Sequence, residues 1–201
     1  MINKKLRKMI KSLFYLLVSL PFISAITNVT QVTLPENTIL INEEIDDELI
    51  TKTIGDLYSV ESNDIYFYIN SNGGSVHAGN RLIEQMTFME SNNKIIHCIG
   101  HKVISMAFVI FQHCTHRYSL DTSIAMQHQM SLMLGGGVEN INTFFKMIKT
   151  IYKDLVVYQA NKLKMDLLEF REKIKIDWWT YGKELVENNI SDKIVTVGKK
   201  Y

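Results

Sequence analysis

The stretch Ile65-Tyr66-Phe67-Tyr68-Ile69-Asn70-Ser71-Asn72-Gly73-Gly74-Ser75 decides the fold of this chain. Its first six residues form an apolar run typical of a buried strand, and the pair Gly73 and Gly74 follows where that strand ends. Glycine lets the backbone turn sharply into a helix and leaves amide N–H groups unobstructed, as oxyanion and phosphate sites require. The stretch therefore predicts a strand, a tight turn able to bind an anion, and a helix.

The surrounding sequence continues this alternation of strands and helices. In chain order it predicts a strand at 38–41, a helix from Ile45 to Leu57, a strand at 65–70, a helix at about 76–89 and a strand at 94–99. Strands joined by helical crossovers pair in parallel, with right-handed connections. Because the strand runs are apolar at successive positions, we expect helices to cover both faces of the sheet. The fold class is α/β.

A serine and a histidine lie at the ends of two predicted elements. Ser105 opens an apolar helix, and His128 follows the strand-like run 125–127. A serine at that position is often only a helix N-cap, and a lone histidine is often a structural hydrogen-bonding residue. Together with the glycine turn, however, the two residues predict a nucleophile, a base and an anion hole.

Several segments resemble, in the same order, the family of Clp protease proteolytic subunits. They are residues 44–48, 66–79, 105–106, 126–129 and 185–195. The resemblance implies a peptidase domain at residues 38–195, followed by a short tail at 196–201. It also implies the single-domain fold of the Clp protease and crotonase type, with repeated β-β-α units and a projecting handle helix. Asn72 and Met130 stand where the family usually has proline, and the Gly100 to Ser105 spacing is one residue longer.

The resemblance implies a serine endopeptidase that hydrolyses peptides or unfolded proteins inside an oligomeric chamber. Ser105 would be the nucleophile, His128 the base, and the amides of Gly73, Gly74 and Met106 the oxyanion hole. The expected partners are other copies of the chain in rings of seven and, unless the protein is exported, an AAA+ unfoldase. No cofactor and no metal are expected.

The acid of the catalytic triad is open. Lys173 stands where the family has its aspartate, with Glu172 beside it and Asp177 one helical turn later. We rank Asp177 first. Glu172, a Ser-His dyad and a dyad of Ser105 with Lys173 are the alternatives.

Two other functions remain as alternatives. One is a catalytically inactive structural subunit of a ring, which the lysine at the acid position favours. The other is a crotonase-type acyl-CoA enzyme, which is disfavoured because that chemistry does not require a serine and a histidine at these positions.

A long helix is predicted after Gly135-Gly136-Gly137, with apolar residues at helical spacing from Ile141 to Leu155. On its own this pattern is that of a helix packed in the core. The resemblance instead implies the handle helix, preceded by a glycine segment that lines the cleft and pairs with an extended substrate.

Composition is that of one globular domain: the chain has 201 residues, of which 46% are hydrophobic and 21% charged. Residues 1–25 hold five of the 22 basic residues and no acidic one, so the remainder carries 17 basic against 21 acidic side chains. A body with net charge −4 has no electrostatic footprint for nucleic acid.

The beginning of the chain has the pattern of a targeting segment. A basic stretch ends at Lys11, an apolar run spans 13–23, and Ile23-Ser24-Ala25 is a small-residue cleavage site. We expect a cleaved signal peptide at residues 1–25 and an exported protein of the secretory pathway. A membrane anchor, an organellar leader and a disordered extension are the alternatives.

The two cysteines, Cys98 and Cys114, are expected to be small buried hydrophobic residues, with a bridge between them as the alternative. Histidines lie near both cysteines, but their spacing matches no standard zinc pattern. A metal site is therefore disfavoured.

Overall fold

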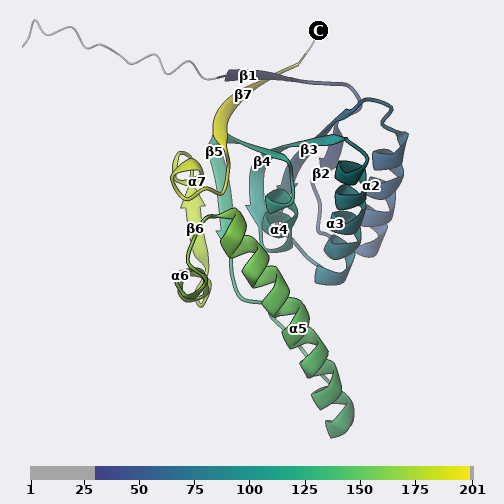
Figure 1. Cartoon of the computed structure of the whole chain (residues 1–201), viewed down its shortest axis with the longest axis vertical. Coiled ribbons are helices and arrows are strands. Elements are labelled where there is room, and N and C mark those ends of the chain that lie inside the picture. The colour runs from purple at the N-terminus through teal and green to yellow at the C-terminus, as the bar shows by residue number, and fades with distance from the viewer. Residues whose placement is uncertain (1–29, 200–201) are drawn as a thin grey trace, which may run out of the picture.

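A computed structural model describes residues 30–199, so the predicted signal segment lies outside the described residues. Seven strands form one sheet in the order β1-β7-β5-β4-β3-β2, and β6 pairs with β5 beside this path (Figure 1). The strands are β1 (Thr30–Leu34), β2 (Ile39–Ile41), β3 (Asp64–Ser71), β4 (Ile95–Ile104), β5 (His116–Gln127), β6 (Trp178–Tyr181) and β7 (Lys193–Lys199). All pairs are parallel except β5 with β6. The predicted α/β class with a parallel sheet is confirmed.

Six helices accompany the described sheet. They are α2 (Asp47–Ser59), α3 (Val76–Ser91), α4 (Met106–Gln112), α5 (Val138–Lys162), α6 (Leu167–Lys173) and α7 (Glu184–Glu187). The helix α2 begins where Asp46 accepts a hydrogen bond from the N–H of Leu49 at 2.8 Å, and acidic residues fill its first turn. The helix α3 packs between α2 and α4. Among the described helices, none combines the length and the apolar character needed to cross a bilayer.

The two faces of the central strands differ. In β3, Ile65, Phe67 and Ile69 are fully buried, whereas the alternate positions Tyr66 and Tyr68 are half-buried. The second face of β3 is therefore less completely buried than its apolar sequence pattern predicted. The second face carries aromatic and imidazole rings, which tolerate partial contact with water. Tyr66 stacks on His97 with ring centroids 4.7 Å apart.

A bulge in β4 accommodates one unpaired residue between Gly100 and Ser105. Ile69 of β3 pairs with Gly100, but the next residue, Asn70, pairs with Lys102, so His101 has no counterpart in β3. A β-bulge inserts one residue into a strand without changing where that strand ends. Ser105 therefore still follows directly after the end of β4.

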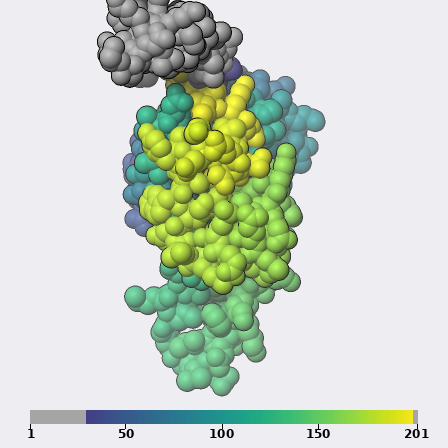
Figure 2. Space-filling view, turned by 90° about the vertical axis from the view of Figure 1, so that its left-hand side faces the viewer, coloured from purple at the N-terminus to yellow at the C-terminus, as the bar shows by residue number. Residues whose placement is uncertain are grey.

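The helix α5 projects from the body of the molecule (Figures 1 and 2). Near its C-terminal end Val156, Gln159 and Ala160 are buried, while Phe144 and Phe145 remain 44% and 45% exposed in its first half. Only the last turns of α5 therefore pack in the core.

A stacked pair of rings joins the end of α5 to α4. The rings of His113 and Tyr158 lie nearly parallel with centroids 3.8 Å apart, and Nδ1 of His113 donates to the carbonyl of Val109 at 2.8 Å. Burial lowers the pKa of His113 to about 4, and the positive charge of Lys162 acts in the same direction. The neutral imidazole is thus the form that fits this contact.

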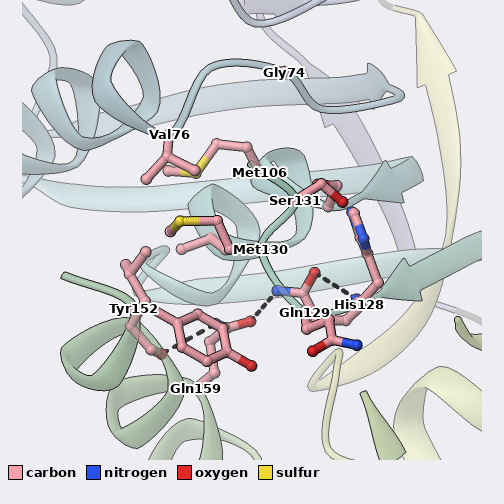
Figure 3. Close-up of a pocket in the computed structure, with 13 residues that line it drawn as sticks. Gly74, Val76, Met106, His128, Gln129, Met130, Ser131, Tyr152 and Gln159 are labelled. Carbon is pink, nitrogen blue, oxygen red and sulfur yellow. Dashed lines mark hydrogen bonds between the residues drawn. The ribbon is translucent and has the colours of Figure 1, made fainter. Parts of the chain in front are cut away.

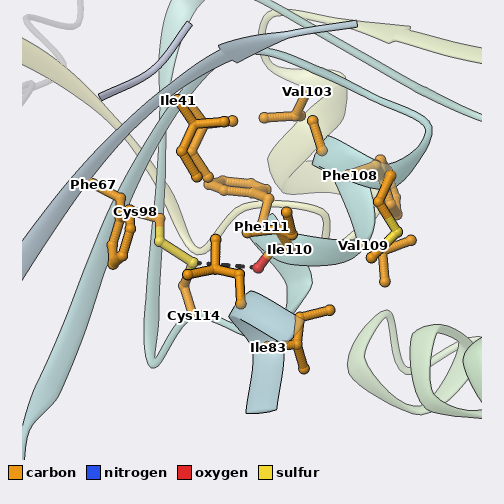
Figure 4. Close-up of a cluster of buried hydrophobic side chains, with 14 of the residues drawn as sticks. Ile41, Phe67, Ile83, Cys98, Val103, Phe108, Val109, Ile110, Phe111 and Cys114 are labelled. Carbon is orange, nitrogen blue, oxygen red and sulfur yellow. Dashed lines mark hydrogen bonds between the residues drawn. A yellow bond between two sulfur atoms is a disulfide. The ribbon is translucent and has the colours of Figure 1, made fainter. Parts of the chain in front are cut away.

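Cys98 and Cys114 are both fully buried, as predicted, but they are joined in a disulfide (Figure 4). Their Cα atoms lie 6.0 Å apart, within the range that a disulfide spans. The expectation of two separate thiols is therefore wrong. Cys98 lies on β4 and Cys114 just after α4, so the bridge closes the β4–α4 unit on itself.

We expect the bridge to contribute to stability. Closing a loop of this size, with a sequence separation of 16 residues, stabilises a fold by about 3 kcal/mol in the loop-entropy estimate. Denaturation of the wild-type protein with and without dithiothreitol should therefore give different unfolding free energies, and a Cys98→Ala/Cys114→Ala variant should be insensitive to reductant. Equal unfolding midpoints for the wild-type protein in both conditions would contradict the bridge.

We also expect a specific loss of stability in mild acid. The ordinary histidine pKa is 6.5, so between pH 6.5 and about 4 the unfolded chain binds a proton at His113 while the folded chain does not. Unfolding free energy from this group is fully present above pH 6.5 and falls by about 3 kcal/mol as the pH drops to 4. His113→Phe, which keeps the stacked ring, should flatten this part of the profile in chemical denaturation. An equally steep profile in His113→Phe would contradict this role of His113.

Candidate functional site

Ser105 and His128 meet at one edge of the sheet. Ser105 lies between β4 and α4, and His128 follows the last residue of β5. Because β4 and β5 are parallel neighbours, their C-terminal ends lie side by side. Nε2 of His128 and Oγ of Ser105 are 2.8 Å apart, within hydrogen-bonding distance. The structure thus brings together the predicted nucleophile and base.

The backbone of Ser105 is held in a strained conformation. Its φ of 55° lies in the left-handed region, which costs a residue with a Cβ about 1–2 kcal/mol. The N–H of Ser105 donates to the carbonyl of Met126 on β5 at 2.9 Å, and every residue of α4 behind it is buried. These contacts hold the turn in a conformation that an isolated chain would avoid.

The glycine turn packs directly on this serine turn. Gly73 and Gly74 have φ of 90° and 150°, and a Cβ on Gly73 would lie 2.6 Å from the carbonyl oxygen of Ile104 and 2.9 Å from the amide nitrogen of Met106. Only glycine permits this approach. The sequence prediction of a tight turn at this position is correct.

Among the contacts of residues 30–199, two amide N–H groups beside Ser105 have no acceptor. Ile45 donates to the carbonyl of Gly73 at 2.8 Å and accepts from the N–H of Ser75 at 2.7 Å, which forms a parallel bridge to Gly74. In that pattern the N–H of Gly74 itself points away from Ile45. Met106 is the first residue of α4, so its N–H has no acceptor within the helix.

The third predicted amide is already engaged. The N–H of Gly73 donates to Oγ of Ser71 at 3.1 Å. Of the three amides expected from the sequence, those of Gly74 and Met106 are therefore the ones that an incoming oxygen can reach.

A cavity of about 220 Å³ opens beside Ser105 and His128. Its walls are mostly apolar and come from Val76, Met106, Val109, Met130, Tyr152 and Leu155. Figure 3 shows His128 on one side, Met106, Met130 and Tyr152 on the other, and Gln159 at the base. Met130 and Ser131 line the cavity, whereas the predicted lining by the glycines 135–137 is not seen. Those glycines lie farther along the chain, where residues 135–137 are exposed.

Sequence reasoning missed two cavity residues, Gln127 and Gln159, which are 4% and 3% exposed. Gln127 immediately precedes His128, and Gln159 lies in the only part of α5 that is buried. A buried polar residue next to the proposed base was a usable signal, but its partner on α5 could be identified only from the fold.

No hydrogen bond joins Asp177, the acid ranked first, to His128. Asp177 is exposed in the turn before β6, one residue from Trp178, which pairs with Gln127 in the sheet. Within residues 30–199, the hydrogen bonds of His128 are those to Ser105 and to the side chain of Gln127. The structure therefore does not form the triad that we ranked first.

The other two residues considered for the acid and base roles have different partners. Nζ of Lys173 lies 3.8 Å from a carboxylate oxygen of Glu169 and 5.2 Å from the ring centroid of Trp178. Glu172 pairs with Lys175 at 2.6 Å. Neither geometry supports a contact with the serine or the histidine.

The end of α6 nevertheless lies next to the histidine. The N–H of Gln129 donates to the carbonyl of Ile174 at 2.9 Å, and its side-chain amide donates to the carbonyl of Lys175 at 3.1 Å. A side chain at position 173 therefore starts close to the segment that carries His128. Across residues 30–199, no group of three or more histidine, cysteine, aspartate or glutamate side chains is arranged to hold a metal ion.

Comparison with known proteins gives one consistent result. The sequence profile of the family described as Clp protease matches residues 24–198. The chain is 28% identical over 169 residues to ATP-dependent Clp protease proteolytic subunit 2 of Tropheryma whipplei, which covers 81% of this chain and 93% of that protein. It is 27% identical over 167 residues to the ATP-dependent Clp protease proteolytic subunit of Borreliella afzelii, covering 81% and 84% respectively.

The contact between the two turns predicts unequal effects of two glycine substitutions. Gly73→Ala should lower the unfolding free energy by about 2–4 kcal/mol, because the new Cβ meets backbone atoms and the positive φ is strained. Gly55→Ala in α2 is the matched control: nothing lies within 4 Å of its new Cβ, so it should be neutral or stabilise by up to about 1 kcal/mol. Urea denaturation measures both values. Equal stability of the two variants would show that the turns do not depend on the glycine.

Proposed function

The chain belongs to the Clp protease family, and on that basis we propose that it is a serine endopeptidase whose nucleophile is Ser105. The observation that carries the proposal is the 2.8 Å contact between Oγ of Ser105 and Nε2 of His128, beside two available amides. A hydroxyl is a weak nucleophile until a neighbouring base removes its proton.

In the proposed reaction, Oγ of Ser105 attacks the scissile carbonyl while Nε2 of His128 takes its proton. The imidazolium then returns that proton to the departing amine, leaving an ester on Ser105. A water molecule, deprotonated by His128, hydrolyses the ester and restores both groups. The N–H groups of Gly74 and Met106 donate to the oxyanion in both steps, and one such donor is worth about 10²–10³ in kcat.

The base works without a carboxylate in this proposal. Loss of the orienting acid costs about 10⁴ in kcat in a triad, because that acid fixes the imidazole and stabilises its charged form. We therefore propose a Ser-His dyad of reduced activity. The alternative, favoured by Lys173 at the family's acid position, is a catalytically silent subunit with a structural role in the ring.

The first half of α5 supports the proposal of a ring assembly. Val138, Phe144, Phe145 and Met147 are 71%, 44%, 45% and 49% exposed there, and such a group of apolar side chains on a projecting helix is typical of an interface. Rings of seven subunits, as the family resemblance implies, would enclose Ser105 in a chamber for peptides or unfolded chains.

Export is a further part of the proposal. It depends on residues 1–25, and the Cys98–Cys114 bridge supports it because disulfides persist mainly in oxidising compartments. An exported subunit would act without a cytosolic AAA+ unfoldase and would be limited to peptides and unfolded chains.

The catalytic proposal is tested with a fluorophosphonate and a peptide library. The probe should label the wild-type protein, and Ser105→Ala should abolish labelling. His128→Ala should lower peptide hydrolysis by about 10²–10⁴-fold, because the general base is lost. Lys173→Asp should raise activity by about tenfold or more if it supplies the missing acid.

Matched changes separate this outcome from a general charge effect. Lys175→Asp makes the same change in charge two residues away, at an exposed position, and should not raise activity. Asp177→Asn should have little effect on a dyad and cost about 10⁴-fold if Asp177 orients His128. Absence of both labelling and cleavage by the assembled wild-type protein would support the silent subunit instead.

A further inference from the structure

Two buried glutamines form a polar floor in the otherwise apolar cavity beside Ser105. Gln127 ends β5 and Gln159 lies on α5, and both line the cavity. Glutamine is seldom buried unless its amide is hydrogen-bonded, and an apolar pair would fill the same space without that requirement. The pair therefore calls for an explanation that packing does not give.

The hydrogen bonds of the pair leave part of its capacity unused. The amide nitrogen of Gln127 donates to the side-chain oxygen of Gln159, and the side-chain oxygen of Gln127 accepts from the N–H of His128 at 3.1 Å. The amide nitrogen of Gln159 donates to the carbonyl of Leu155 at 3.0 Å. A carboxamide has two N–H donors and two acceptor lone pairs. Among the described residues, each amide thus keeps one N–H and one lone pair without a partner.

The cavity lining restricts which side chain can use that capacity. None of the lining residues is an aspartate, glutamate, lysine or arginine, so a charged group entering the cavity would lose water without gaining a counter-charge. A purely apolar group would cover the remaining N–H groups and leave them unpaired. A carboxamide is uncharged, and it both donates and accepts.

We propose that Gln127 and Gln159 form the subsite for the substrate residue on the N-terminal side of the scissile bond, and that this subsite selects glutamine or asparagine. The inference rests on the proposed function of Ser105, because the cavity is defined by its position next to that residue and to the amides of Gly74 and Met106. The first side chain before the scissile carbonyl is the one that enters a cavity at this place.

A purely structural role makes a different prediction. The Gln127–Gln159 bond also connects β5 to α5, so replacing it would lower stability whether or not the pair contacts substrate. The ratio of cleavage rates between two substrates does not respond to stability alone. Substrate preference is therefore the informative measurement.

The experiment compares peptides that differ only at the residue before the scissile bond, with glutamine or with methionine, which has a similar size and no amide. The wild-type protein should show a kcat/KM about tenfold higher for glutamine. In Gln127→Met/Gln159→Met, which removes both amides at nearly constant volume, methionine should become the equal or better substrate. Gln85→Met is the matched control: Gln85 accepts from Tyr58 on α2, outside the cavity, and its replacement should keep the wild-type ratio.

The remaining outcomes are also decisive. An unchanged glutamine-to-methionine ratio in the double variant, or no preference in the wild-type protein, overturns the proposal. If the double variant does not fold, Gln159→Met alone keeps the bond from His128 to Gln127 and should lower the ratio partway. If Ser105 proves unreactive, the proposed function fails, and calorimetric binding of the same two peptides to Ser105→Ala protein decides the subsite by whether glutamine binds more tightly.

Discussion

The close contact of the glycine turn with the serine turn is the constraint on which the site depends. A Cβ on Gly73 would overlap the backbone of Ile104 and Met106, and a Cβ on Gly74 would lie 2.4 Å from the carbonyl oxygen of Ile45. Three segments distant in sequence thus approach one another closely, mainly through backbone atoms. Backbone contacts cannot be adjusted by a change of rotamer, so the amides beside Ser105 keep fixed positions before any ligand arrives.

The sheet preserves this contact despite an irregularity in its strand pairing. His101 is absorbed as a bulge, and the hydroxyl of Ser123 donates to the carbonyl of Gly100 at 2.6 Å where the β4–β5 register shifts. The residues after the bulge return to regular pairing, with Ile104 opposite Met126. In that restored pairing the carbonyl of Met126 accepts a hydrogen bond from the N–H of Ser105. His128, two residues after Met126, then lies within hydrogen-bonding distance of Ser105. An insertion that moved Ser105 by one residue would have turned its side chain away from the histidine.

Local patterns and the order of the family motifs could be read from the sequence, whereas contacts between residues outside those motifs could not. Apolar runs and the glycine pair that follows one of them predicted the strands, the parallel sheet and the glycine turn. Ser105 and His128, each predicted at the end of an element, lie together in the structure. The Cys98–Cys114 bridge was not preferred because spacing alone does not give the distance between a strand and the end of the next helix. The half-buried face of β3 was misjudged because Tyr66 and Tyr68 count as apolar in a pattern although they remain in partial contact with water. The polar floor went unnoticed because Gln127 and Gln159 are 32 residues apart and meet only in the fold.

The buried glutamines and the absent acid are connected through His128. In a triad a carboxylate orients the imidazole and stabilises its positive charge, whereas here the side chain of Gln127 holds the backbone N–H of the same residue. The side-chain amide of Gln127 is neutral and binds the main chain of His128. It helps to hold that residue in place but contributes little to the stability of an imidazolium. On the proposed function and subsite, Gln127 therefore holds the backbone of His128 but does not replace the acid as a partner of the imidazole ring. Departures from local rules of burial and strain often cluster at functional sites, and here a strained serine and a buried amide pair line one cavity. On the proposed function we expect slow catalysis from this arrangement, because the hydrogen bond to the backbone N–H of His128 neither orients the imidazole ring nor stabilises its positive charge.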